Sequence, residues 1–362
     1  MDERIVEHAA VLVEWSARIE AGDDVVLAVA PGAHDLAVAV AAELGDRGAN
    51  PVVTYTSGEI NRAYLRAHDD EFDENPAHEH ALYENADAVL SLGGGRNASA
   101  MADVPGQTRS THATAREKVR EAYMNTDWVS TVHPTRSLAQ QAGMSYEAYR
   151  EFVYDAVLRD WEALAEEMSG LKERLDAGRE VRIVGEGTDV TMAIENRTAV
   201  NSTASVADDS HNLPSGEVFT APYGTEGHAT FDVPMTVRGK RVQDVRLTFE
   251  DGEVIDYDGP AVIGEILDTD DGARRLGELG IGMNRGIDRP TDSILFDEKM
   301  AGTVHLALGR AYDACLPDGE AGNESAVHVD LITDMSDDSR LEIDGETVQR
   351  DGAFRWEAGF EE

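Results

Sequence analysis

The sequence has almost no cysteine and no long hydrophobic run. Cys315 is the single cysteine among 362 residues, which excludes an intrachain disulfide and therefore a small disulfide-stabilised scaffold. No segment approaches the ~20 consecutive apolar residues of a membrane-spanning helix. The charged start, MDERIVEH, lacks the apolar segment of a secretion signal. These absences lead us to expect a soluble, cytoplasmic protein without a membrane partner.

Lysine is scarce as well, and negative charge dominates the chain. Asp and Glu number 71 against 31 Lys and Arg, which gives a net charge of −40 at pH 7. Only four of the basic residues are lysine: Lys118, Lys172, Lys240 and Lys299. A polyanion of this size is repelled by nucleic acid, so we expect no nucleic-acid partner. Because molar salt screens the self-repulsion, the composition is typical of a halophilic protein.

Hydrophobic patterning divides the chain into two parts. In the first part, short apolar runs predict strands at 24–29, 51–55, 86–92 and 128–132, with helical segments between them. This alternation indicates parallel βαβ units. The run Gly93–Gly95 lacks the spacing of a phosphate-binding loop, so we interpret it as a turn at a strand end. A continuous apolar face predicts one long helix over 145–174, which ends near Gly178.

The second part is rich in strands. Asp-Gly pairs at 251–252, 344–345 and 351–352 indicate hairpin turns, and one helix is predicted at 271–279. We therefore predict an α/β protein in which an N-terminal parallel βαβ domain, residues 1–178, is followed by a β-rich α+β domain, residues 179–362.

Two histidines of the second part lie in apolar strands. The alternation of a strand places His328 and Asp330 on the same face. Buried polar groups need partners, and either a hydrogen bond between these two side chains or a metal ion would satisfy both. His305 lies in the apolar run 302–309.

Two glutamates strengthen the case for a metal. Glu217 follows the turn-forming run 212–216, and Glu278 lies between Gly277 and Leu279, where it could also be a solvated helix-end residue. Imidazole and carboxylate together suit one or two divalent cations such as Zn²⁺, Co²⁺ or Mn²⁺. The candidate ligands are Glu217, Glu278, His305, His328 and Asp330.

Four strings in this order resemble the aminopeptidase T / aminopeptidase S family of metallopeptidases, the thermophilic metalloprotease family: NLPSGEVFTAP (212–222), LGELGIGMN (276–284), LFDEKMAGTVHLALGRAY (295–312) and ESAVHVDLITDM (324–335). The resemblance implies a dinuclear metal site on the five candidate ligands, which makes residues 179–362 the catalytic domain. It implies a catalytic tyrosine at Tyr312 and a homodimer. A further family glutamate would correspond to Glu298, either as an extra ligand or as a residue behind the ligands.

The implied activity is that of a metal-dependent aminopeptidase, which hydrolyses the N-terminal peptide bond of peptides with a two-metal-activated water. Tyr312 would donate a hydrogen bond to the developing oxyanion, and Glu217 or Glu278 could take the proton of the water. His211, directly before the first string, is a candidate substrate contact. Two other functions stay open at this point: another two-metal amidohydrolase, and a two-domain solute-binding protein.

The charge predicts how folding depends on salt. We expect the melting temperature, measured by circular dichroism, to rise as KCl increases from about 0.1 M to molar concentration. Over this range the Debye length falls from about 10 Å to about 3 Å, so neighbouring carboxylates repel one another less. A melting temperature that stays flat or falls would contradict the halophilic interpretation. It would not affect the assignment to a peptidase family, which depends on the motifs.

Overall fold

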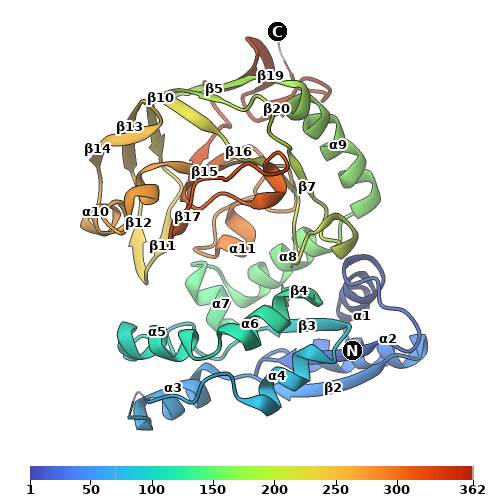
Figure 1. Ribbon diagram of the computed structural model, residues 1–362. Helices are drawn as coiled ribbons and strands as arrows, with labels where there is room; N and C mark the ends of the chain where they lie inside the picture. The colour runs from blue at the N-terminus through green and yellow to red at the C-terminus, as the bar shows by residue number, and fades with distance from the viewer. Residues whose placement is uncertain (70, 361–362) are drawn as a thin grey trace. The chain divides into compact units, whose positions relative to one another are not determined.

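The computed structural model describes residues 1–69 and 71–360, and it divides the chain into two compact units (Figure 1). Unit 1 comprises Met1–Leu158 and Ala204–Pro214, and unit 2 comprises Arg159–Thr203 and the chain from Ser215 onward. This division differs from the predicted boundary at residue 178 in two places. Helix α9 (Trp161–Ala177) belongs to unit 2 because its apolar face packs on strands of that unit, β7 and β9. The segment 204–214 returns to unit 1, where it adds a strand to the sheet.

Unit 1 is built on a parallel five-stranded sheet with the order β2-β1-β3-β4-β8. Its strands are β1 (Asp24–Val29), β2 (Asn50–Tyr55), β3 (Ala88–Gly93), β4 (Asp127–Val132) and β8 (Asn212–Leu213). The central strands β1 and β3 are buried along most of their length, as expected for a parallel sheet that helices cover on both faces.

The helices of unit 1 connect these strands and flank the sheet, with α1 packed on α2 and α4 on α6 (Figure 1). They are α1 (Glu3–Ala10) with the π-helical continuation η1 (Val11–Ser16), α2 (His34–Arg47), α3 (Gly58–Ala67), α4 (Ala77–Glu84), α5 (Gly106–Thr114), α6 (Glu117–Met124), α7 (Arg136–Gln141), α8 (Tyr146–Val157) and the 3₁₀ turn η2 (Val206–Asp208). No helix in the described ranges is both long enough and apolar enough to cross a membrane.

The prediction of one long helix over 145–174 was wrong. The segment forms two helices, α8 and α9, because the chain leaves the helical conformation at Leu158. The side chain of Asp160 then accepts a hydrogen bond from the Ala163 N–H and begins α9. The apolar residues keep a helical spacing through the whole segment, so they do not reveal the break between the two helices. Asp160 does indicate it, because Asp is favoured at the N-cap of a helix.

The turns after β1 and β3 lie against each other. Gly32 N–H donates to the Gly94 carbonyl at 2.8 Å, and a Cβ on Gly32 would lie 2.5 Å from that oxygen. Gly94 itself has a φ of +137°. In a sheet of this order, ligands bind beside the carboxyl ends of neighbouring strands. Here the direct contact of two backbones accounts for Gly32 and Gly94, and the run Gly93–Gly95 lies at a strand end, as predicted, because Gly93 is the last residue of β3.

Unit 2 contains two larger sheets, whose described strands pair in antiparallel fashion, and a small hairpin of β11 (Met235–Val237) and β12 (Lys240–Val242). The eight-stranded sheet has the order β14-β13-β10-β6-β5-β18-β19-β20. Its strands are β5 (Glu180–Gly185), β6 (Thr188–Ala193), β10 (Tyr223–Phe231), β13 (Val245–Glu250), β14 (Glu253–Asp258), β18 (Arg340–Ile343), β19 (Glu346–Arg350) and β20 (Ala353–Phe354).

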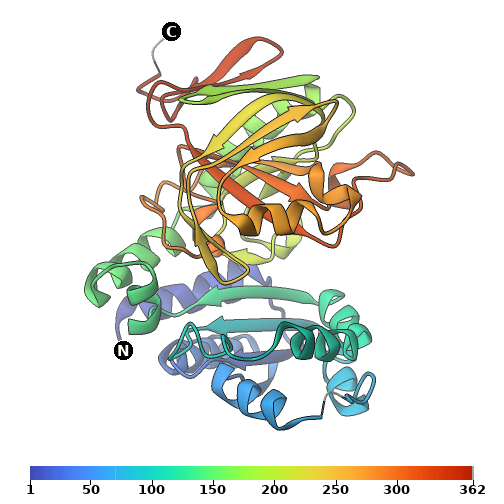
Figure 2. The same ribbon diagram turned by 90° about the vertical axis from the view of Figure 1, so that its left-hand side faces the viewer.

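The second sheet of unit 2, with the order β17-β16-β15-β9-β7, contains one strand from each of the four motifs. Its strands are β7 (Val200–Ser202), β9 (Glu217–Thr220), β15 (Leu276–Gly282), β16 (Thr303–Gly309) and β17 (His328–Asp334). Every residue of β15 and β16 is buried. Strand β10 of the larger sheet contacts β15 and β17, so the two sheets lie next to each other (Figure 2). The remaining elements are α10 (Ala261–Leu267), η3 (Asp271–Arg274), α11 (Ile294–Asp297) and η4 (Asp313–Cys315).

The helix predicted at 271–279 was also wrong. Only a short 3₁₀ turn forms at Asp271–Arg274, and the chain then enters β15. Gly277, Gly280 and Gly282 disfavour a helix, and each lies where a neighbouring strand or loop comes too close for a Cβ. Glu278 is therefore a buried strand residue rather than a solvated helix end. The predicted fold class, a parallel α/β unit and a β-rich unit, is confirmed.

Candidate metal centre

One face of the sheet formed by β17, β16, β15, β9 and β7 gathers the candidate ligands. Partners that pair directly across antiparallel strands point to the same face. Gly280 pairs with His305 on one side and with Phe219 on the other, and Gly282 pairs with Glu217. On the next strand, Ile332 pairs with His305. The two-residue period then brings His328 and Asp330 to this face, as the sequence predicts.

The imidazole of His305 lies across Gly280. A Cβ on Gly280 would be only 2.0 Å from His305 Nε2, so any other residue at this position would displace the ring. Glycine is therefore required at position 280, because the histidine of the neighbouring strand occupies the space that a side chain would need.

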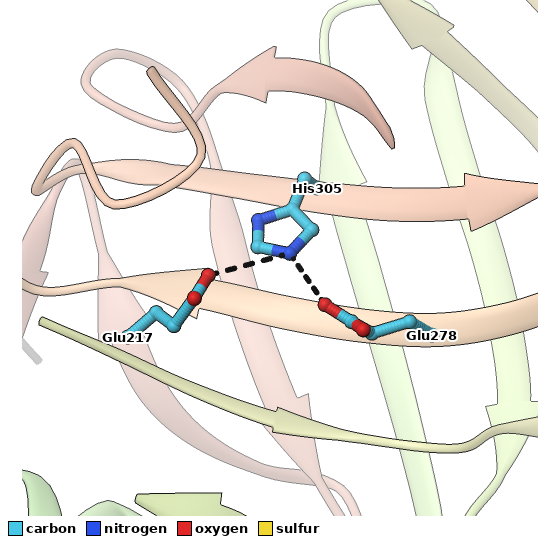
Figure 3. Close-up of side chains that lie close together, drawn as sticks. All are labelled: Glu217, Glu278 and His305. Carbon is cyan, nitrogen blue, oxygen red and sulfur yellow. Dashed lines mark hydrogen bonds and ion pairs between the residues drawn. The ribbon is translucent and has the colours of Figure 1, made fainter. Parts of the chain in front are cut away.

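The first group of donors surrounds His305, which is completely buried. Its Nε2–H donates to Glu278 Oε1 at 2.9 Å, and Glu217 Oε2 lies 3.6 Å from the same nitrogen (Figure 3). The two carboxylates come from different strands and converge on one edge of the ring (Figure 3). One ligand atom from each of these three side chains lies within 4.8 Å of the others.

The second group shares Glu278 with the first. His328 Nε2 lies 3.3 Å from Asp330 Oδ1 and 3.7 Å from Glu278 Oε2. Its other ring nitrogen, Nδ1, donates to the Arg310 carbonyl at 2.9 Å, which fixes the ring with Nε2 toward the carboxylates. The ligand atoms of Glu278, His328 and Asp330 again lie within 4.8 Å of one another. The two oxygens of Glu278 thus face two separate histidines.

A buried lysine completes the cluster, and sequence reasoning missed it. Lys299 Nζ forms ion pairs with Glu298 and with Glu217 Oε1, the latter at 3.4 Å. Glu298, whose role the resemblance left open, therefore lies beside the lysine. A signal was present in the sequence, because Lys299 is one of only four lysines and stands in the motif string LFDEKMAG.

Comparisons with known proteins identify the family of the chain. Residues 1–354 match the thermophilic metalloprotease (M29) family. The chain belongs to this family. It is 30% identical to aminopeptidase T of Thermus thermophilus over 93% of both chains. It is 37% identical to aminopeptidase 2 of Geobacillus stearothermophilus, over 39% of this chain and 37% of that protein.

Solved structures show the same fold. Wild-type AmpT from Thermus thermophilus matches with a TM-score of 0.84 at 26% identity, over 98% of this chain and 99% of that one. A 2,5-dihydroxypyridine dioxygenase from Pseudomonas putida KT2440 matches with a TM-score of 0.55 at 13% identity, over 98% and 96%. The second match shows the fold alone, so the chemistry has to be argued from the side chains. Membership of the M29 family confirms the prediction of a hydrolase of the peptidase class.

The clustered side chains of this M29 member fit divalent cations. Imidazole nitrogens and carboxylate oxygens are the donors that Zn²⁺, Co²⁺ and Mn²⁺ accept. Glu217 Oε2 is buried and receives no hydrogen bond from the described part of the chain. Four carboxylates, those of Glu217, Glu278, Glu298 and Asp330, share the cluster with Lys299, so additional positive charge is required to balance them.

The pKa values of the two histidines show how the protein supplies that charge without a metal. Burial lowers the pKa of His305, but the hydrogen bond to Glu278 and the charge of Glu217 outweigh it and raise the pKa to about 10. Burial likewise lowers the pKa of His328, and Asp330 and Glu278 raise it to about 9. Both imidazoles are therefore protonated at neutral pH in the metal-free protein.

The carboxylates respond differently to the same surroundings. Burial raises the pKa of Glu217, of Glu278 and of Glu298 above the usual range. Burial also favours the neutral form of Asp330, but the hydrogen bond from His328 outweighs it and lowers the pKa of this group. These opposed shifts in one cluster are typical of functional sites.

Tyr312 lies at the rim of the cluster. Its ring centroid is 5.0 Å from that of His328 and 5.7 Å from that of Phe219, and 46% of the residue is exposed. Burial of the hydroxyl and the nearby carboxylates raise its pKa, so Tyr312 stays protonated.

His211 belongs to unit 1, whereas the cluster is built by unit 2. It is stacked on Trp128 with ring centroids 4.4 Å apart. Both ring nitrogens are engaged, Nδ1 with the Trp128 carbonyl at 2.8 Å and Nε2 with Asp209 Oδ1 at 3.0 Å. The expected contact between His211 and substrate stays a prediction.

The raised pKa values of His305 and His328 predict that metal uptake releases protons. A cation binds the neutral imidazole, so it must displace the proton from each ring. We expect Zn²⁺ binding near neutral pH to release about one proton per histidine, and the Zn²⁺ affinity to increase as the pH rises toward about 9. Calorimetric titrations in buffers of different ionisation enthalpy measure the released protons. A Zn²⁺ affinity independent of pH between about 6 and about 9 would contradict the assignment of both rings as ligands.

Proposed function

We propose that this chain is a metal-dependent aminopeptidase that removes the N-terminal residue from peptides. Two divalent cations, Zn²⁺, Co²⁺ or Mn²⁺, would be held by Glu217, Glu278, His305, His328 and Asp330. The observation that carries the proposal is the position of Glu278, whose two oxygens face two separate imidazoles. Glu217, Glu278 and His305 would hold one cation, and Glu278, His328 and Asp330 would hold the other.

The chemistry would be divided between the cations and the protein. Bound at the two groups, the cations would act as Lewis acids and lower the pKa of a water molecule. Tyr312, protonated at the rim, would donate a hydrogen bond to the oxyanion that develops on the scissile carbonyl. The proton that the attacking water loses would pass to Glu217, because both oxygens of Glu278 face the proposed cation positions. Burial of His305, Glu217 and Glu278 strengthens each of these electrostatic interactions.

The proposal includes partners and location. The substrates would be peptides with a free N-terminus, and the protein would act as a cytoplasmic homodimer, as the family resemblance and the composition suggest. The peptidase family favours an enzyme over a solute-binding protein.

Metal removal and a blocked substrate test the activity directly. In molar KCl, the protein should release p-nitroaniline from leucine p-nitroanilide but not from its N-acetyl derivative, because an aminopeptidase requires the free α-amine. EDTA should abolish the release, and Zn²⁺, Co²⁺ or Mn²⁺ should restore it. Equal activity on the N-acetyl substrate would indicate another amidohydrolase instead. Bound metal without turnover on a panel of aminoacyl substrates would contradict the proposed activity.

Removal of the Tyr312 hydroxyl tests the role of that side chain. Tyr312→Phe should lower kcat by roughly 10²–10³, the effect of losing one donor to an oxyanion. The metal content should be unchanged, because the hydroxyl is not among the proposed ligands. A decrease in kcat of less than about threefold, far below the loss of such a donor, would show that the ring only packs against Phe219 and His328.

A further inference from the structure

Lys299 is a charged side chain with no exposed surface. It is fully buried beside the candidate metal ligands, whereas lysines are almost never fully buried without a partner. Its partners are Glu298 and Glu217, with Nζ 3.4 Å from Glu217 Oε1. A cation buried next to a cation-binding site needs an explanation, because its charge opposes the binding of another cation.

The backbone holds Lys299 firmly against the sheet. The lysine follows α11, whose residue Asp297 accepts hydrogen bonds from the N–H groups of Thr291 and Ser293. The Lys299 carbonyl accepts a hydrogen bond from Asn284 N at 3.0 Å. At Gly282, a Cβ would lie 2.1 Å from the Met300 carbonyl, so this loop touches the end of β15 directly.

Gly282 is also the strand partner of Glu217. The strand that carries Glu217 and the loop that carries Lys299 therefore both lie against Gly282. Neither side chain depends on a flexible surface segment for its position.

The two oxygens of Glu217 consequently have different neighbours. Oε1 faces Lys299 Nζ, whereas Oε2 faces His305 Nε2 at 3.6 Å. We propose that Lys299 is a positioning residue, which holds Glu217 so that only Oε2 is offered to the cation shared with His305 and Glu278. The same ammonium group holds Glu298 beside itself. This inference rests on the proposed metal-dependent function.

A role in charge balance alone predicts the opposite effect. If Lys299 only neutralised carboxylates, its removal would leave more negative charge and the cation would bind more tightly. If Lys299 positions Glu217, its removal lets the carboxylate turn, and the cation binds more weakly. Loss of a partner behind a metal ligand typically weakens metal affinity 10–100-fold. The sign of the change therefore separates the two roles.

The experiment measures Zn²⁺ affinity by competition with a chromogenic chelator in molar KCl at neutral pH. Lys299→Met removes the charge and keeps the length of the side chain. We expect one of two Zn²⁺ ions, the one at Glu217 and His305, to bind about 10–100-fold more weakly, and the other, at His328 and Asp330, to be retained. Equal or tighter binding of both ions would overturn the proposal.

Two further variants keep the result interpretable. Lys172→Met breaks a lysine–carboxylate pair with Asp176 on the surface of α9 and should leave both Zn²⁺ affinities unchanged. If Lys299→Met does not fold, the double variant Glu298→Gln/Lys299→Met keeps the net charge of the cluster, and it is compared with Glu298→Gln alone, which retains the ammonium group. Weaker binding at the Glu217 position in the double variant than in Glu298→Gln supports the proposal, and equal or tighter binding overturns it. Wild-type protein that takes up none of Zn²⁺, Co²⁺ and Mn²⁺ would instead refute the proposed function itself.

Discussion

The concentration of four buried or half-buried carboxylates in one cluster is the constraint on which the site depends. Carboxylates without a compensating charge are costly inside a protein, and here Glu217, Glu278, Glu298 and Asp330 share one cluster. Lys299 supplies one permanent positive charge. The protons of His305 and His328 supply two more in the metal-free protein, and burial raises the pKa values of Glu217, Glu278 and Glu298, which favours protonation within the cluster. In the proposed active form, cations take the place of these protons, so metal binding and proton binding compete at the same atoms.

Two glycines of the sheet leave the space that this cluster of charged side chains needs. Gly280 leaves space for the His305 ring, and Gly282 lets the loop with Lys299 approach the strand. The donors themselves come from adjacent antiparallel strands, whose register is fixed by backbone hydrogen bonds. A site on strands is positioned more accurately than a site on loops. A dioxygenase shares the fold at 13% identity, which shows that such a scaffold is not tied to one reaction.

Charge poses a second, separate problem on the outside of the molecule. The net charge of −40 creates repulsion among exposed carboxylates, which dissolved salt can screen. Salt has little effect on buried groups, so the inner carboxylates require fixed partners at short distance. The exposed pairs, such as Lys172 with Asp176, contribute little to stability. The same residue types therefore act differently at the surface and in the core of unit 2.

The sequence by itself determined the fold class, the shared face of His328 and Asp330, and the family. These properties depend on local patterns: the period of a strand, the alternation of strands with helices, and short motifs. Two predictions from local patterns were wrong: the helix at 271–279 and the single helix over 145–174. A glycine-rich buried strand and two consecutive helices can each carry apolar residues at a spacing that also fits one helix.

Only the tertiary structure decided how the candidate ligands are grouped. The sequence named five ligands, but it did not show that Glu278 faces both histidines or that Lys299 holds one oxygen of Glu217. It also did not show that α9 belongs to the second unit and that 204–214 returns to the first. Each of these facts depends on strand register and on contacts between residues far apart in the chain. Such contacts are fixed by the packing of the whole unit, which no short segment of sequence contains.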